Sequence, residues 1–419
     1  MTNSHHIKEV HIIGGGLFGC LLAYQLSKKK IKISIFERSN ELLNSFNSIE
    51  LNKIKLNNGF HGIEFPRAKK LYNFFKDKLK VKFNTFEINR KIIFKKYIIN
   101  YTDKKSEWPN QISSYLKNTN VPYKNQKINF FFKKKIINLF KQNSLKYTNN
   151  TINDKSFFLP WFLPADIKHL SNDEGDKFRS LIRTKKIRGK VMLPASHTFS
   201  VIKKKMYDFL ISKNIKIYFN TKVSFQNQKM NYFTNGNEIK FQKKNIKKTF
   251  FCLSSAFLIQ DLSKKHFSNI KKNKKYGINC LIRINNKNKL LKNFSEILPL
   301  NRKIYYINRI YSLNYFGYKK KDNFLVLEII KKNKLFSKKL QENMLEEIKN
   351  IFNLKSKPKI LEYKITREIY QPDKKWITTS KKILINKIKK NYNIIYTNDF
   401  YPINMNKAWI NSIKYSKNI

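Results

Sequence analysis

Four glycines within six positions constrain this chain more than any other feature. The segment Val10 to Cys20, VHIIGGGLFGC, holds four of the 11 glycines in 419 residues, directly after an apolar run. The spacing Gly14-x-Gly16-x-x-Gly19 is typical of a turn between a buried strand and a helix, where the first glycine allows the tight turn. The second lets the backbone approach a pyrophosphate, and the third lets the helix pack closely on its strand. The segment therefore predicts a nucleotide-binding turn.

The residues on either side of this turn support the same prediction. His11 to Ile13 is predicted to end a buried strand, and Leu17 to Leu26 to form an apolar helix whose N-terminal N–H groups face the phosphates. Lys32 to Phe36, KISIF, is predicted to be a second strand, and it leads into Glu37. An acid about 20 residues beyond the glycines binds a ribose hydroxyl and repels a 2′-phosphate, so NADP is disfavoured. The alternative is a glycine-rich turn in another kind of parallel sheet.

The composition is strongly basic, with 87 Lys and Arg against 27 Asp and Glu and a net charge of +60. Such a charge suggests nucleic acid or an anionic membrane surface as a partner. The excess is nearly all lysine and is scattered along the chain, whereas nucleic-acid sites usually depend on arginine. Drift in AT-rich coding explains this pattern better than selection does, so no specific nucleic-acid partner is expected.

Length and cysteine content limit the architecture and the compartment. A chain of 419 residues is too long for one compact core and predicts two or three domains. Cys20, Cys252 and Cys280 lie far apart, and the seven histidines make no metal-ligand spacing. No apolar run reaches the roughly 18 residues of a membrane span, and no apolar signal-peptide core precedes the first strand. We therefore expect a cytoplasmic protein without a metal site.

Hydrophobic periodicity predicts an interleaved order of elements after the first strand–helix–strand unit. Strands are expected in these segments: Phe86 to Tyr101 as a hairpin, Ile215 to Phe219, Thr249 to Leu253, Ile278 to Ile284, Lys303 to Tyr318, Phe324 to Ile330 and residues 393–400. Helices are expected in these: Val201 to Leu210, Lys338 to Phe352 and residues 404–415. A simple nicotinamide dehydrogenase keeps its dinucleotide domain in one piece, so this order indicates another kind of protein.

Two segments of the middle region have a distinctive composition. Lys127 to Lys141 is predicted to be a basic amphipathic helix, which would either lie on a membrane surface or pack its aromatic side inward as a cap helix. We favour the cap helix, with a weak membrane-surface contact as the alternative. Phe157 to Pro164, FFLPWFLP, is interrupted by prolines and is predicted to be a rigid aromatic loop.

This order resembles the flavoprotein superfamily that holds amine oxidases, protoporphyrinogen oxidases and UDP-galactopyranose mutases. IIGGGLFG is similar to the opening FAD turn, NNGFHGIEF to the glycine–x–histidine segment near the flavin, and FNTKV to the stretch whose valine meets the adenine. IIYTNDF with NMNKAWINSI is similar to the closing element, in which an acid and a helix N-terminus approach the ribityl chain. The resemblance implies FAD as the cofactor, bound by Gly14, Gly15, Gly16, Leu17, Phe18, Gly19, Glu37, Arg38, Gly59, His61, Val223, Asp399, Met405 and Asn406.

The resemblance also implies a fold class and a domain division. The fold would be α/β, with a Rossmann-like FAD/NAD(P)-binding domain formed by residues 1–85, 186–265 and 365–419. Residues 86–185 and 266–364 would form an α+β substrate domain with a mixed or antiparallel sheet and a helical cap. The chain departs from the pattern where NELLNSFNS follows Glu37 in place of paired glycines, and where Asn398 precedes the closing acid in place of glycine.

The function implied is that of an FAD-dependent oxidoreductase, which acts on a small molecule, a nucleotide sugar or an amine, by hydride transfer to flavin N5. One alternative is a redox-neutral flavoenzyme of the UDP-galactopyranose mutase kind. A second is a lysine-rich protein that binds nucleic acid or an anionic surface and keeps a vestigial flavin fold. The candidate catalytic residues are His61, Arg367, Tyr370 and Arg309, of which an arginine would hold a carboxylate or a diphosphate. A purely structural role is the alternative for each.

Overall fold

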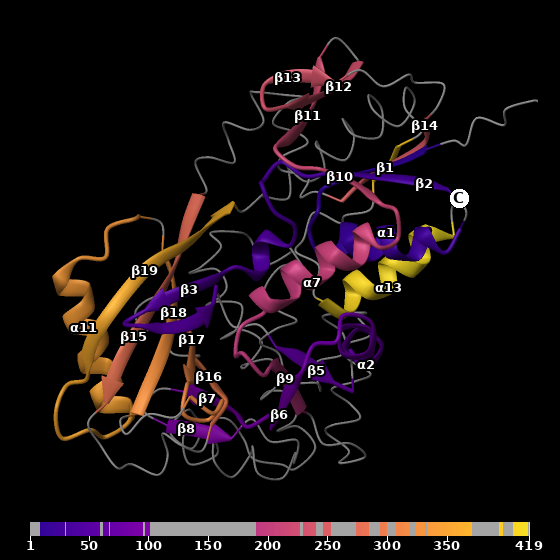
Figure 1. Ribbon diagram of the computed structural model, residues 1–419. Coiled ribbons are helices and arrows are strands. Elements are labelled where there is room, and N and C mark those ends of the chain that lie inside the picture. Colours follow the sequence, from indigo (N-terminus) through magenta and orange to yellow (C-terminus); the bar gives the residue numbers. More distant parts are fainter. Residues whose placement is uncertain are drawn as a thin grey trace, which may run out of the picture.

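The computed structural model describes residues 9–29, 31–58, 62–66, 68–94, 97–100, 190–226, 229–239, 246–252, 274–284, 294–299, 307–318, 323–331, 333–370, 394–396, 405–417 and 419. Two large sheets of different character dominate this part of the chain (Figure 1). One is a five-stranded parallel sheet covered by helices, and the other is a seven-stranded, mostly antiparallel sheet with α11 on its outer face.

The parallel sheet has the strand order β10-β2-β1-β14-β20. β1 runs in register with both neighbours, so that Ile12 lies beside Ile35 on β2 and Phe250 on β14. The predicted strands of this sheet are confirmed, and they come from separated stretches of the chain: β1 (Glu9–Ile13), β2 (Lys32–Phe36), β10 (Lys216–Tyr218), β14 (Ile246–Phe251) and β20 (Ile394–Tyr396). Strands whose faces are both covered have continuous apolar runs, which explains sequences such as VHII and KISIF.

Helices α1, α7 and α13 lie side by side against this sheet, with α2 below them in the view of Figure 1. α1 is buried almost all round, because Phe18 to Ala23 and Leu26 are enclosed by the sheet and the neighbouring helices. Tyr24 of α1 joins the layer, since its ring lies 4.8 Å from that of Phe74 and 6.5 Å from that of Trp409. The bounds are α1 (Leu17–Ser27), α2 (Lys69–Asn73, continued by a π-helical turn at Phe74–Lys78), α7 (Ser200–Ile211) and α13 (Met405–Ser416).

A small antiparallel sheet covers the other face of the parallel sheet. It consists of β11 (Thr221–Gln226), β12 (Lys229–Thr234) and β13 (Asn237–Ile239). Its Tyr232 is 2% exposed, and its ring lies 4.6 Å from that of Phe36. The Tyr232 hydroxyl also lies 2.7 Å from Nδ1 of the fully buried His11 on β1, so a polar contact is enclosed between the two sheets.

The larger sheet has the order β19-β15-β18-β17-β16-β7-β8, and only β16 and β7 pair in parallel. This confirms the expected mixed sheet. α11 (Lys338–Ile351) packs Met344 and Ile348 against one face in a second core cluster with Cys280 and Leu327. The strands are β7 (Arg90–Phe94), β8 (Tyr97–Asn100), β15 (Lys274–Ile284), β16 (Glu296–Pro299), β17 (Ile307–Ser312), β18 (Asn323–Lys331) and β19 (Lys359–Tyr370).

Short strands connect the two halves of the molecule, and the sequence patterns did not predict them. The hairpin of β3 and β4 contacts β19, where Asn52 N donates a 2.6 Å hydrogen bond to Glu362. A second small sheet has the order β5-β9-β6. The bounds are β3 (Ser48–Leu51), β4 (Ile54–Asn57), β5 (Ile63–Phe65), β6 (Phe83–Glu87) and β9 (Lys190–Pro194), with a 3₁₀ turn at Asn44–Phe46.

One predicted strand is wrong in its extent. Lys303 to Tyr318 was expected as a single strand, but β17 ends at Ser312 and a turn follows through Gly317, whose φ is +78°. The turn is stabilised by Asn314, because its Oδ1 accepts a 2.9 Å hydrogen bond from Phe324 N at the start of β18. The predicted helix at 127–141 and the loop at 157–164 lie outside the described residues. Of the helical cap predicted within 86–185 and 266–364, α11 is described, and the domain boundaries stay a prediction. Within the described residues, no helix is both long and apolar enough to span a bilayer.

Candidate dinucleotide-binding site

The turn between β1 and α1 has the close packing that the glycine spacing predicts. Gly14 has φ +108°, a conformation that side chains disfavour, and its N–H donates a 2.8 Å hydrogen bond to Phe36 O. A Cβ on Gly19 would lie 2.0 Å from Gly14 O. The helix therefore lies so close to the turn that no side chain fits at Gly19.

Gly16 has a different role, because a Cβ built on it meets nothing within 4 Å. It is the N-cap of α1, with an extended backbone and no side-chain cap, and no acidic residue occupies the first helical turn. An uncapped helix N-terminus presents backbone N–H groups and the positive end of the helix dipole. Leu17 and Phe18, which begin the helix, are therefore placed to present N–H groups to an anion in front of Gly16.

Glu37 lies directly after β2 and is bound to the glycine turn. Its Oε2 accepts a 2.6 Å hydrogen bond from Gly15 N, and its Oε1 accepts from both N and Oγ of Ser39 at 2.8 Å. These three bonds fix the carboxylate beside the turn. An ionised carboxylate has about four acceptor positions, so capacity remains for a ribose hydroxyl.

The loop after Glu37 closes over the same turn without the usual glycines. Leu43 adopts the left-handed conformation, with φ +54° and ψ +42°, and its N–H donates a 2.9 Å hydrogen bond to Gly15 O. A leucine thus has a backbone conformation that glycine normally supplies, at a cost of roughly 1–2 kcal/mol. Its side chain is fully buried, which offsets that cost. The loop is therefore hydrogen-bonded to the glycine turn although it lacks paired glycines.

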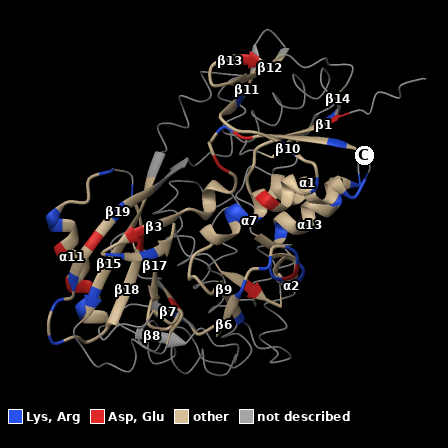
Figure 2. Cartoon of the chain, viewed as in Figure 1, with Lys and Arg blue, Asp and Glu red and all other residues tan. Residues whose placement is uncertain are grey.

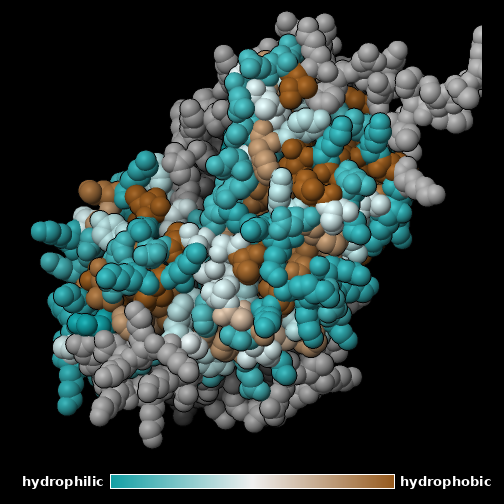
Figure 3. Space-filling model, viewed as in Figure 1, coloured by the Kyte–Doolittle hydropathy of each residue, from teal (hydrophilic) through white to brown (hydrophobic). Residues whose placement is uncertain are grey.

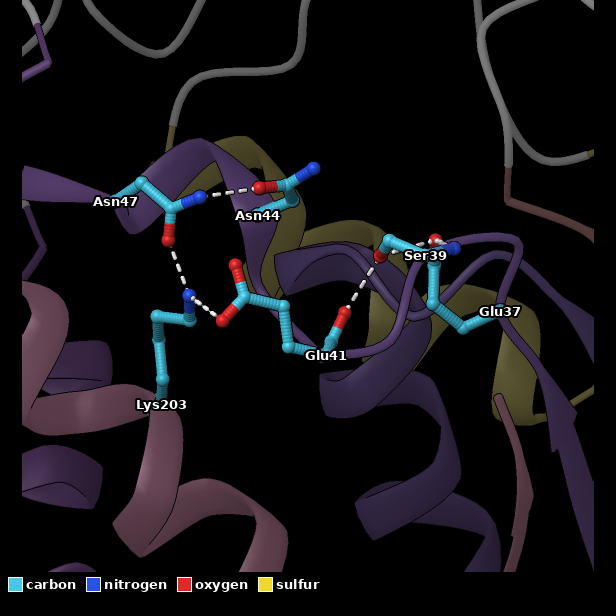
Figure 4. A network of polar contacts seen from close by, with 6 residues as sticks. All are labelled: Glu37, Ser39, Glu41, Asn44, Asn47 and Lys203. Atoms are coloured by element: carbon cyan, nitrogen blue, oxygen red, sulfur yellow. Dashed lines mark hydrogen bonds and ion pairs between the residues drawn. The ribbon is translucent and has the colours of Figure 1, made fainter. Parts of the chain in front are cut away.

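A polar network continues from this loop to α7 (Figure 4). The single hydroxyl proton of Ser39 has a second possible acceptor in Glu41 O, which also lies 2.8 Å from Oγ, and the Glu41 carboxylate pairs with Lys203 of α7. Lys203 donates in addition to Asn47, which in turn donates to Asn44. The hydrogen bond from Lys203 holds the pKa of Glu41 below its usual value. The sequence offered no signal for this network, because Lys203 lies more than 150 positions from the loop residues that it binds.

The remaining residues that were predicted to bind the cofactor lie on several different elements. Arg38 is exposed. Val223 lies on β11, and Thr221, the first residue of that strand, donates a 2.9 Å hydrogen bond from its N–H to Glu37 O. α13 begins at Met405, as predicted, with Asn406 next to it. Gly59, His61 and Asp399 lie outside the described residues. The glycine turn, Glu37 and the start of β11 are thus brought together by hydrogen bonds, and the role of each stays a prediction.

Of the candidate catalytic residues, Arg309 has described side-chain contacts. Its Nε lies 3.2 Å from Glu296 on β16 and 3.9 Å from Glu328 on β18. The two carboxylates are 3% and 5% exposed. Because neighbouring residues such as Ile297 and Leu327 belong to the core under α11, the charged group lies on the opposite face of the sheet, toward the parallel-sheet half.

Sequence reasoning missed both glutamates, although a signal was present. Each is an acid within an apolar strand, in FSEILPL and FLVLEIIKK, in a chain with only 27 acids. The other two catalytic candidates are placed by their backbone alone. Arg367 and Tyr370 lie on β19, opposite Gly277 and Lys274 of β15.

The described residues fit the ADP portion of a dinucleotide. The space in front of Gly16 and the uncapped N-terminus of α1 suit a pyrophosphate, and the preformed carboxylate of Glu37 suits a ribose diol. This portion is common to FAD and NAD. The choice between them depends on the rest of the chain.

Comparison with known proteins supports the fold. A family model for an NAD(P)-binding Rossmann-like domain matches residues 12–77, which include the glycine turn and Glu37. A search of curated proteins gives no match. A protein from Exiguobacterium sp. 255-15, classified provisionally as a protoporphyrinogen oxidase, is similar in structure with a TM-score of 0.61 and 10% identity over 100% of this chain and 99% of its own.

Two further solved structures show the same likeness. A reduced UDP-galactopyranose mutase gives a TM-score of 0.59 and 13% identity over 98% of this chain and 93% of its own. A putrescine oxidase bound to putrescine gives a TM-score of 0.53 and 10% identity over 98% of both chains. Residues 12–77 therefore match an NAD(P)-binding Rossmann-like domain, and over nearly its whole length the chain shares its fold with these three solved structures.

Proposed function

We propose that the protein is an FAD-dependent oxidoreductase that acts on a small molecule. The observation that carries this proposal is the Gly15–Glu37 hydrogen bond beside the open space at Gly16, which prepares a site for the ADP portion of a dinucleotide. FAD is favoured over a diffusible nicotinamide because the strands of the parallel sheet are separated in sequence by those of the seven-stranded sheet. FAD, when bound, accepts a hydride at N5.

The residues of this chain would supply binding, orientation and electrostatics. The N–H groups at the start of α1 would hold the pyrophosphate, and Glu37 the ribose. α13, which packs beside α1 and begins at Met405, would bring its N-terminus toward the middle of the cofactor. The seven-stranded sheet would present its face opposite α11 to the substrate.

The group of Arg309, Glu296 and Glu328 on that face favours an amine over a nucleotide sugar as the substrate. A substrate diphosphate would compete with Glu296 and Glu328 for Arg309 and would approach both buried carboxylates. A substrate ammonium group would be attracted by the same carboxylates. This argument supports the oxidoreductase over the mutase alternative, which requires arginines for a diphosphate.

Optical spectroscopy of the purified protein tests the cofactor directly. We expect flavin absorbance bands, present on isolation or after addition of FAD, that dithionite bleaches. Anaerobic addition of a panel of primary and secondary amines should then bleach the same bands, and UDP-sugars should not. A protein that takes up no FAD would overturn the proposal. Bleaching by neither panel would leave a flavoprotein whose substrate is not an amine.

A further inference from the structure

The turn between β18 and α11 presents the most exposed large apolar side chain in the described part of the chain. Leu335 is 73% exposed, and Tyr363 and Ile365 on β19 are 40% and 43% exposed. The ring of Phe336, the residue after Leu335, lies 4.8 Å from that of Tyr363, so this turn lies beside β19. Leu335, Phe336, Tyr363 and Ile365 are here called the apolar corner. Elsewhere in the described residues, only Tyr207 and Ile211 on α7 are large, apolar and comparably exposed.

The exposure of Leu335 is enforced by its neighbours. Its carbonyl accepts a hydrogen bond from the Lys331 ammonium group, and the next residue, Phe336, is 4% exposed. Gln341 Nε2 donates a 2.7 Å hydrogen bond to Phe336 O, and Ser337 caps α11 by accepting from Leu340 N. The backbone is thus held on both sides of Leu335, and its side chain is kept in solvent.

Exposed lysines surround the apolar corner. Lys334 precedes Leu335, and Lys338 and Lys339 occupy the first turn of α11, which carries no acid. Cations at a helix N-terminus oppose the helix dipole, so this arrangement is unfavourable for the protein alone and favourable against an anionic surface. Figure 2 shows Lys and Arg together with Asp and Glu along α11, whose glutamates follow the first turn, and Figure 3 shows apolar surface beside hydrophilic surface at this end of the molecule.

We propose that the apolar corner docks the protein on an anionic lipid bilayer, with Leu335 entering the interface and Lys334, Lys338 and Lys339 facing the lipid phosphates. A bilayer uses both features, since an apolar side chain gains by leaving water and lysines are attracted to anionic lipids. Nucleic acid would use only the lysines. Because α11 lies at the side of the molecule away from α1 and α13, docking leaves the glycine turn accessible (Figure 1). The proposal is independent of the proposed function.

Vesicle sedimentation with matched variants tests this proposal, because a charge of +60 alone draws the protein to anionic lipid. The full chain is mixed with phosphatidylcholine vesicles that contain or lack phosphatidylserine. Leu335→Ser is compared with Ile211→Ser, an equally conservative change at the exposed apolar site on α7. Lys338→Glu/Lys339→Glu is compared with Lys204→Glu/Lys213→Glu, which changes the net charge equally at exposed positions on and after α7.

The two pairs of variants should distinguish docking through the apolar corner from attraction by the net charge of the whole protein. We expect Leu335→Ser to weaken partitioning into anionic vesicles about tenfold, as loss of most of one buried leucine side chain implies, with Ile211→Ser unchanged. The α11 charge reversal should weaken it at least about 25-fold, from about fivefold per lysine near the surface, and the α7 reversal far less. Equal losses within each pair, or no binding to anionic vesicles, would overturn the proposal. Unchanged far-UV circular dichroism verifies that all four variants fold.

Discussion

The carboxylate of Glu37 accepts a hydrogen bond from the backbone N–H of Gly15, with 2.6 Å between Gly15 N and Glu37 Oε2. This bond joins the turn after β1 to the residue after β2, the two central neighbours of the parallel sheet. Ser39 donates twice to the other carboxylate oxygen. The acid is therefore oriented before any ribose arrives, and preorganisation of this kind lowers the cost of binding.

Replacing Glu37 by Gln should weaken FAD binding while the protein stays folded. The amide has one acceptor oxygen and an NH₂ group, so it must face either Gly15 N–H or the Ser39 donors with a donor of its own. Loss of a hydrogen bond to a charged group costs about 1.5–3 kcal/mol, which corresponds to at least about tenfold in Kd. Titration with FAD, followed by flavin fluorescence, measures the change.

Glu41→Gln is the matched control for this experiment. Glu41 belongs to the same loop but pairs with Lys203 on α7 instead of contacting the glycine turn. Its replacement should leave the affinity for FAD unaltered. An equal loss of affinity in both variants would show that the loop as a whole, and not the Glu37 carboxylate, determines binding.

Two alanine substitutions in the glycine turn should differ in their effect on stability. At Gly19 a Cβ would lie 2.0 Å from Gly14 O, so Gly19→Ala must displace the backbone and should lower both the unfolding temperature and FAD uptake. At Gly16 the φ is −68° and nothing lies within 4 Å of a Cβ. Gly16→Ala should therefore keep the unfolding temperature and lose FAD, because the methyl group enters the space of the pyrophosphate. Thermal unfolding without FAD separates the two cases, and full FAD uptake by Gly16→Ala would place the phosphates elsewhere.

The sequence predicted those elements whose signals are local. β1, α1 and β2 follow from apolar runs around a glycine pattern, and α11 follows from its periodicity and ends one residue before the expected Phe352. The parallel strand order depends on pairings between residues far apart in the sequence, such as Ile12 with Phe250. Only the superfamily resemblance supplied that long-range information.

The candidate site was also predictable only where its signals are local in the sequence. Gly14, Gly16, Gly19 and Glu37 were found from spacing, whereas the partners of Arg309 depend on how β16, β17 and β18 align. Leu43 shows another limit, because no pattern identifies a leucine in the left-handed conformation. Its neighbours enforce that conformation through the hydrogen bond to Gly15 O.

At Leu43, substitution by glycine should be less destabilising than substitution by alanine, which is the reverse of the usual order. Both substitutions remove a fully buried side chain and should destabilise the protein by about 2–5 kcal/mol. Alanine keeps the strain of φ +54°, whereas glycine relieves it, so Leu43→Gly should be the more stable of the two by about 1 kcal/mol. Leu42 is similarly buried without a positive φ, so alanine should be the better replacement there. Urea unfolding of the four variants gives the comparison, and the same ranking at both positions would refute the assigned strain.

Arg309→Met should be strongly destabilising, because it leaves the carboxylates of Glu296 and Glu328 buried without their arginine. Breaking a buried ion pair by removal of one partner costs about 3–5 kcal/mol. Lys349→Met on α11 is the control, since its pair with Glu346 is partly exposed and should contribute far less to stability. The free energy of unfolding in urea measures both. Similar small losses would show that Arg309 is solvated and its contacts with the glutamates weak.

Glu9 should make the stability depend on acid pH. The pKa of its carboxyl lies below the usual 4.5, first because of the neighbouring His11 imidazole, whose Nε2 lies 3.8 Å from Glu9 Oε1, and also because Ser34 donates a hydrogen bond, while burial has the opposite effect. A lowered folded-state pKa gives stability that is fully present above the unfolded value and is lost as the pH falls through the folded value. The free energy difference between the wild-type chain and Glu9→Gln should therefore be constant, at about 1 kcal/mol, above about pH 5.5 and should shrink below about pH 4.5. Ser34→Ala should reduce this pH-dependent difference, and a difference that grows toward acid pH would show that Glu9 is destabilised by its burial instead.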